Sequence, residues 1–164
     1  MYRSNGYPNF SGLFGRRPQA IARIKGGAEY PDIVGSVWFY PSPVGVLTVA
    51  EIYGLPLSRG KCGGRVFGFH IHYGDSCGAD ESGAEFSLTG AHYDNKECEH
   101  PYHAGDMPPL FSNNGYAFLS FVNGKISIDE IVGKTVVIHD GSDDLSTQPA
   151  GNSGKKIACG EILG

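Results

Sequence analysis

The sequence predicts an all-β fold, with short antiparallel strands arranged as a sandwich or Greek-key barrel. Two observations support this prediction. The 164 residues include 25 glycines and 10 prolines but only 18% charged residues, a composition typical of many short elements joined by turns. Apolar residues also alternate with small or polar ones over short segments, without a long amphipathic helix. We expect one domain over residues 17–164, preceded by a flexible lead-in over residues 1–16.

Seven segments have the apolar patterning of strands. They are residues 19–26, 33–42, 44–56, 65–72, 116–123, 134–139 and 155–163. About eight strands are expected in all, and one helical turn is predicted over residues 127–133. Two long irregular stretches, residues 73–114 and 140–154, separate these segments. Loops of such length in a compact domain are usually functional or disordered.

Charge and hydropathy limit the classes of function. The formal net charge is -4, and the absence of a Lys/Arg cluster argues against nucleic-acid binding. The apolar stretches are too short to span a bilayer, and the first 17 residues lack the apolar run of a signal peptide. We therefore expect neither nucleic acid nor membrane as a partner. The compartment stays open between the cytoplasm and a trimmed exported form.

The six histidines fall in only three places, namely two predicted strands and the first long loop. His70 and His72 lie two residues apart in a predicted strand, so both rings can project from one face toward one metal ion. His139 ends another strand. Taken singly, these residues have simpler explanations, such as a half-exposed pair on a sheet edge and a core histidine bonded to the backbone.

The first long loop contains a second set of metal-binding residue types. His92, His100, His103 and Asp106 offer three nitrogens and one oxygen, enough for a closed tetrahedral zinc site. The simpler explanation is a polar surface loop. A metal would fold such a loop, whereas its few apolar residues would not anchor it.

Five segments, taken in order and spacing, resemble a known family. They are "GFHIH", "GAHYDN", "HAGD", "VVIH" and "GNSGKKIACG". Over about residues 17–163 the chain resembles the copper/zinc superoxide dismutases, in their bacterial form. This resemblance implies an eight-stranded antiparallel Greek-key β-barrel or sandwich, with two long metal-binding and active-site loops. It also implies copper and zinc as cofactors.

The resemblance assigns a role to every histidine. The implied ligands are, for copper, His70, His72, His92 and His139, and, for zinc, His92, His100, His103 and Asp106. The ring of His92 would bridge the two metals and carry a proton during catalysis. Asp143 would hold one histidine of each site by hydrogen bonds from outside the ligand set.

The implied activity is the disproportionation of superoxide to oxygen and hydrogen peroxide by Cu(II)/Cu(I) cycling, with a structural zinc. A homodimer is the expected assembly. Two other functions stay open. One is a non-catalytic copper- and zinc-binding module for metal storage or delivery. The other is a mononuclear zinc hydrolase built from His100, His103 and Asp106, which would need an open zinc position that His92 would fill.

The resemblance also implies a disulfide between Cys77 and Cys159, which would tie the first long loop to the last strand. It leaves Cys62 and Cys98 unplaced. A second disulfide between them and two free thiols are both compatible with the sequence.

Two features depart from the family pattern. His100 and His103 are only three residues apart, a shorter gap than many members have, which requires a tight turn at Pro101. Lys156 stands where the family usually has an arginine that attracts superoxide, with Lys155 as a competing candidate for this role. Lysine keeps the positive charge but lacks the planar donor fork of arginine.

We therefore expect Lys156→Arg to increase the steady-state rate of superoxide dismutation, because a guanidinium can hold an anion and a backbone carbonyl at once. The rate is measured on protein loaded with both metals, with Lys155→Arg as the matched control. An unchanged or lower rate for Lys156→Arg would contradict the prediction.

Overall fold

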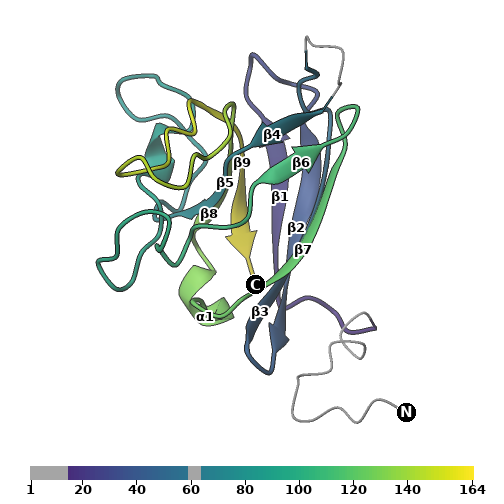
Figure 1. Ribbon diagram of the computed structural model, residues 1–164, viewed down its shortest axis with the longest axis vertical. Helices are drawn as coiled ribbons and strands as arrows, with labels where there is room; N and C mark the ends of the chain where they lie inside the picture. The colour runs from purple at the N-terminus through teal and green to yellow at the C-terminus, as the bar shows by residue number, and fades with distance from the viewer. Residues whose placement is uncertain (1–14, 59–63) are drawn as a thin grey trace.

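The computed structural model describes residues 15–58 and 64–164, which form nine strands, one short α-helix and one 3₁₀ turn (Figure 1). The strands are β1 (Ala20–Gly26), β2 (Val34–Ser42), β3 (Gly45–Tyr53), β4 (Arg65–Phe67), β5 (Phe69–His72), β6 (Leu110–Ser112), β7 (Ala117–Asn123), β8 (Thr135–His139) and β9 (Lys156–Leu163). The helix α1 spans Ile128–Ile131, and the turn η1 spans Ser87–Thr89. In the described ranges, no helix has the length and apolarity that a bilayer crossing requires. The lead-in predicted for residues 1–16 lies almost entirely outside the described residues and stays a prediction.

Every strand pairs with its neighbours in antiparallel fashion. Seven strands form one sheet in the order β5-β8-β9-β1-β2-β3-β7, while β4 pairs with β6. β4 continues into β5 across Gly68, and β6 continues into β7 through a turn closed by hydrogen bonds between Asn113 and Tyr116. The β4-β6 pair thus links the two edges of the large sheet. The predicted all-β class with a Greek-key barrel or sandwich is confirmed.

The alternation that predicted the strands also builds the core. In β1, Ala20, Ala22 and Ile24 are buried, whereas Arg23 and Lys25, on either side of Ile24, are exposed. Successive side chains of a strand point to opposite faces of the sheet, so one face of β1 supplies the core. The core cluster joins residues of both sheets, and its largest fully buried side chains are Phe39, Phe67 and Phe69.

The single strand predicted over residues 65–72 is interrupted at Gly68. The Gly68 N–H donates to the Gly141 carbonyl at 2.7 Å, and the Gly68 carbonyl accepts from the His139 N–H at 2.9 Å. A Cβ atom at Gly68 would lie 2.8 Å from the Cβ of Ser153. The interruption lets β4 pair with β6 while β5 pairs with β8. Counted as one interrupted strand, β4 and β5 bring the total to the expected eight.

The first irregular stretch is shorter than predicted, because β6 lies within residues 73–114. This strand has only three residues and follows Pro108 and Pro109, so it carries too little alternation to be recognised. The predicted helical turn is confirmed as α1. Ser127 and Glu130 form a capping box at its start, in which each side chain bonds the other's backbone.

Two long loops, residues 73–109 and 140–155, lie on the same side of the barrel, beside β5 and β8 (Figure 1). The implied disulfide between Cys77 and Cys159 is present and joins the first loop to β9. Next to it, Phe86 of the loop packs against Val137 of β8. A covalent bond therefore fixes the first loop to β9, and apolar contacts fix it to β8, the strand that ends at His139.

The disulfide spans 82 residues of sequence, so its loss should make the unfolded chain less constrained. We expect the double variant Cys77→Ser/Cys159→Ser to lower the free energy of unfolding by about 2–4 kcal/mol in urea titrations. Cys98→Ser, which removes a free thiol, is the matched control. A double variant as stable as this control would contradict the prediction.

Candidate metal centre

Four histidines converge where β5, β8 and the first long loop meet. His70 and His72 belong to β5, His139 ends β8, and His92 forms a bridge with the backbone of His72. All four side chains are buried, and each offers a ring nitrogen within 4.8 Å of the nitrogens of the other three. The strand spacing predicted for His70 and His72 thus brings both rings to one point.

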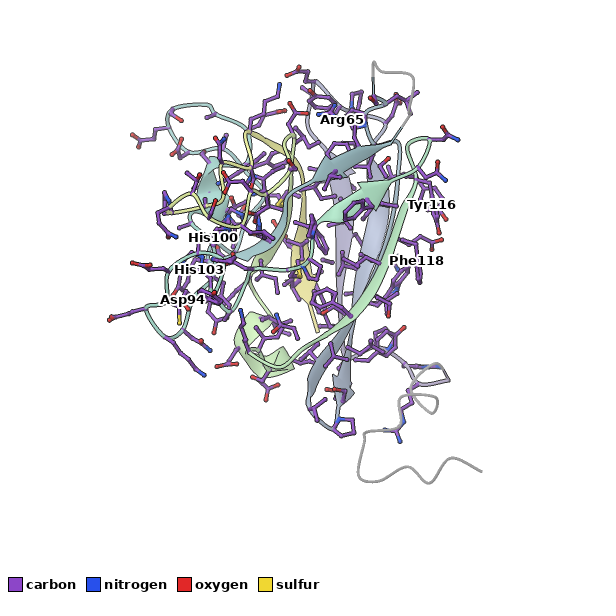
Figure 2. All side chains as sticks on the ribbon, in the orientation of Figure 1. Arg65, Asp94, His100, His103, Tyr116 and Phe118 are labelled. Carbon is purple, nitrogen blue, oxygen red and sulfur yellow. A yellow bond between two sulfur atoms is a disulfide. The ribbon has the colours of Figure 1, made fainter. Side chains whose placement is uncertain are left out.

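A second cluster shares His92 with the first. It consists of His92, His100, His103 and Asp106, whose ligand-type atoms also lie within 4.8 Å of one another. The Asp106 carboxylate lies 2.8 Å from His92 Nδ1 and 3.1 Å from the Nδ1 atoms of His100 and His103. Figure 2 shows His100 and His103 together among the loops, on the side of the molecule opposite Tyr116 and Phe118.

Backbone carbonyls determine which nitrogens of His72 and His139 are protonated. His72 Nδ1 donates to the Gly90 carbonyl at 2.9 Å, and His139 Nδ1 donates to the Gly154 carbonyl at 3.2 Å. A neutral ring carries only one N–H, so both Nε2 atoms present lone pairs. These two Nε2 atoms face each other at 3.2 Å. Two facing lone pairs repel each other, whereas a metal cation would bind both.

Asp143 determines the protonation of His70 and His100 in the same way. Its two carboxylate oxygens accept from His70 Nε2 at 2.7 Å and from His100 Nε2 at 2.8 Å. The lone pairs of both rings are therefore on Nδ1. These Nδ1 atoms are buried and have no hydrogen-bond partner in the described part of the chain. One carboxylate thus orients a ring of each cluster and leaves a free ligand atom on each.

Gly151 packs directly against this hydrogen-bonded group. Its φ of +65° is a left-handed conformation that favours glycine. A Cβ atom at this position would lie 2.0 Å from Asp143 Oδ1 and 2.6 Å from His100 Nε2. The second loop can therefore close over Asp143 only with a residue that lacks a side chain.

The electrostatics of the site favour a bound cation. Burial lowers the pKa of His70, places that of His72 well below its usual value and lowers that of His139 to about 3, so these rings are neutral at pH 7. Burial alone would raise the pKa of Asp143, but hydrogen bonds from His70, the Leu145 N–H and His100 hold it well below its usual range. Neutral imidazoles beside ionised carboxylates are the forms in which these residues bind metals.

The two donor sets fit different metals. Four imidazole nitrogens suit copper, and three imidazoles with one carboxylate form the closed set of a structural zinc site. Three buried ring nitrogens point to the same conclusion, because such atoms rarely lack a partner. Within residues 15–58 and 64–164, no hydrogen bond reaches Nδ1 of His70, Nδ1 of His100 or Nε2 of His92.

Comparison with known proteins assigns the family. The profile described as Copper/zinc superoxide dismutase (SODC) matches residues 33–162. The chain belongs to this family. The Cu-Zn superoxide dismutase of Deinococcus radiodurans is 32% identical over 145 residues, which cover 78% of this chain and 76% of the relative. That of Actinobacillus pleuropneumoniae is 32% identical over 158 residues, which cover 88% and 77%.

Solved structures show the same fold. The Cu/Zn superoxide dismutase from Brucella abortus superposes with a TM-score of 0.73 at 24% identity, over 87% of this chain and 99% of that one. A double mutant of a SOD-like protein from Bacillus subtilis has a TM-score of 0.72 at 26% identity, over 88% and 97% of the two chains.

The two lysines at the junction of the second loop and β9 differ in their surroundings. Lys155 is exposed, forms an ion pair with Glu29 and lies over the ring of Tyr30. Lys156 instead turns toward the first loop, where its ammonium donates to Thr89 Oγ1 at 2.7 Å and to the Gly90 carbonyl at 2.9 Å. Burial lowers the pKa of Lys156. Of the two candidates, only Lys156 has its charge beside the histidine clusters.

Several residues of the candidate metal centre of this superoxide dismutase family member were not predicted from the sequence. The carbonyls of Gly90 and Gly154 orient two rings, Gly151 makes room for Asp143, and Thr89 binds Lys156. Backbone carbonyls carry no signal in residue type, although Gly90 opens the "GAHYDN" motif and Thr89 directly precedes it. Cys98 is a free thiol, while Cys62 lies outside the described residues.

Because Asp143 orients one ring of each cluster, we expect Asp143→Ala to weaken the binding of both metals, roughly 10- to 100-fold. Titration with copper and with zinc, followed by competition with a chelator, measures both affinities. The matched control is Asp140→Ala, whose carboxylate pairs with Arg65 and with no histidine. Loss of one metal alone would contradict the coupling of the two sites through Asp143.

Proposed function

We propose that the protein disproportionates superoxide into oxygen and hydrogen peroxide. In this proposal copper is held by His70, His72, His92 and His139, and zinc by His92, His100, His103 and Asp106. The observation that carries the proposal is the position of His92, whose ring belongs to both donor sets. Its Nδ1 lies beside Asp106, while its Nε2 is buried without a hydrogen-bond partner among the described residues.

Bound copper would supply the one-electron chemistry of both half-reactions, while bound zinc has no redox chemistry of its own. The residues supply the rest. His92 can hold a proton at Nε2 between the two half-reactions and pass it to the product. His72 and His139 cannot take this role, because their Nδ1–H groups bond to carbonyls and their Nε2 atoms face each other.

Capture of the substrate anion depends on local positive charge, because the net charge of -4 weakly repels anions. A cavity of about 250 Å³ borders His139, and its other lining residues, between Thr147 and Gly154, are uncharged. Lys156 lies close enough for its charge to contribute to the lowered pKa values of His72 and His139, after burial and the neighbouring rings. It therefore supplies the attractive charge at the copper side.

The other functions considered gain no support from the site. A mononuclear zinc hydrolase needs an open position on the metal, but the zinc-side set already has four donors. A storage or delivery module does not need a ring common to two donor sets. A homodimer stays a prediction, which sedimentation equilibrium would test.

We expect the purified protein to bind about one copper and one zinc per chain and to remove superoxide catalytically, because the two donor sets match these metals. Elemental analysis gives the metal content, and pulse radiolysis gives the dismutation rate. His92→Ala should abolish most activity, with Asp140→Ala as a matched control. Zinc alone with hydrolytic activity, or both metals without dismutation, would refute the proposal.

A further inference from the structure

The ammonium of Lys156 is held by three acceptors of the first loop. Its Nζ lies 2.7 Å from Thr89 Oγ1, 2.9 Å from the Gly90 carbonyl and 3.4 Å from the Phe86 carbonyl. An ammonium has three N–H donors, so these acceptors account for all of them. Lys156 is thus fixed by hydrogen bonds, although it stands at the start of β9 and has a long flexible stem.

Thr89 is the one acceptor of these three that a substitution can remove, because the other two are backbone carbonyls. Its side chain is fully buried, and its hydroxyl donates to the Phe86 carbonyl at 2.7 Å. The proton of the hydroxyl is therefore committed, and its lone pairs face Lys156. The hydrogen bonds run in one direction, from the ammonium through the hydroxyl to the Phe86 carbonyl.

The same segment is connected to the copper-side histidines. The Gly90 carbonyl, next to Thr89, accepts from both Lys156 Nζ and His72 Nδ1. On the other side, the backbone of Lys156 pairs with that of His139 in the β8-β9 register. When all three acceptors are engaged, the positive charge therefore has a defined position relative to two proposed copper ligands.

We propose that Thr89 is a positioning residue, whose hydroxyl keeps the Lys156 ammonium beside the copper-side histidines and so sets the rate at which the anionic substrate is captured. This inference rests on the proposed superoxide dismutase function. Without the hydroxyl, the ammonium keeps only two backbone carbonyls as partners. Each of these carbonyls also accepts from another donor, and water competes for the ammonium. The flexible stem then lets the charge move toward solvent, where salt screens it.

A purely structural role for Thr89 predicts a different outcome. The bond from Thr89 to the Phe86 carbonyl closes the turn η1, so its loss could loosen the loop whatever the residue at position 156. The two roles separate in a double-mutant cycle with Lys156→Met. If Thr89 acts through Lys156, removing its hydroxyl has no further effect on capture once the ammonium is absent.

The test compares Thr89→Val, which removes the hydroxyl at nearly constant volume, with Thr89→Ser, which keeps it. Thr89→Ala removes the same hydroxyl and serves if the valine does not fit. Thr48→Val is the matched control, because Thr48 is also fully buried but its hydroxyl has no partner in the described residues. Circular dichroism and metal content establish that each variant is folded and loaded.

Two readouts are needed. The first is kcat/KM for superoxide as a function of ionic strength, on protein loaded with copper and zinc. We expect Thr89→Val to lower it roughly three- to tenfold at low salt and to flatten its salt dependence, as loss of local steering requires. Thr89→Ser and Thr48→Val should stay near the wild-type value, and Lys156→Met with or without Thr89→Val should give the same rate.

The second readout does not depend on activity. In the full chain without copper, ¹⁵N-labelled lysine side chains report the exchange of the Lys156 ammonium protons with water. Slow exchange in the wild type and Thr89→Ser, and fast exchange in Thr89→Val, support the proposal. Unchanged exchange or unchanged kcat/KM in Thr89→Val would overturn it, as would a further loss of rate in the Lys156→Met background. An inactive wild type would instead refute the proposed function, and the exchange measurement would still decide whether Thr89 holds Lys156.

Discussion

The structure depends above all on the carboxylate of Asp143, which accepts a hydrogen bond from a ring of each cluster. A carboxylate that only accepts leaves each of these rings with its lone pair turned inward, at Nδ1. Backbone carbonyls likewise accept from Nδ1 of His72 and His139, which leaves the lone pairs of these two rings on Nε2. The protein therefore assembles two groups of lone pairs in a buried space. That arrangement is unfavourable in an ordinary core, and the proposed metals would stabilise it.

The barrel and the loops have separate tasks in this arrangement. The β5-β8 pairing places His70, His72 and His139 on rigid strands, where their spacing follows from backbone register alone. The second donor set lies on a loop, and that loop is held by the Cys77–Cys159 disulfide and by a small apolar cluster. A loop with few apolar residues can in this way position ligands as firmly as a strand does.

Sequence patterns were sufficient for the fold class and for seven strand segments, because strand alternation is a property of residue type. The family resemblance was needed to group the histidines into the two clusters that the structure brings together. Sequence patterns were not sufficient for the break at Gly68, which depends on the approach of Ser153 from a distant loop. Nor could they distinguish Lys155 from Lys156. Both are lysines, and only their partners in the fold distinguish them. Lys155 pairs with Glu29 and faces outward, whereas Lys156 bonds to Thr89. The sequence did not reveal the contacts between distant segments, nor the backbone carbonyls that accept hydrogen bonds from the histidine rings.

The close packing of Gly151 against Asp143 and His100 limits how this site can change in evolution. Most of the second loop is exposed or half-exposed. Apart from Gln148, whose side chain bonds the backbone of His100, its exposed side chains do not contact the rings. At position 151, however, even the smallest side chain would displace the carboxylate that serves both clusters. The absence of a methyl group at this position thus makes it intolerant to mutation, although Gly151 itself supplies no ligand atom to either cluster.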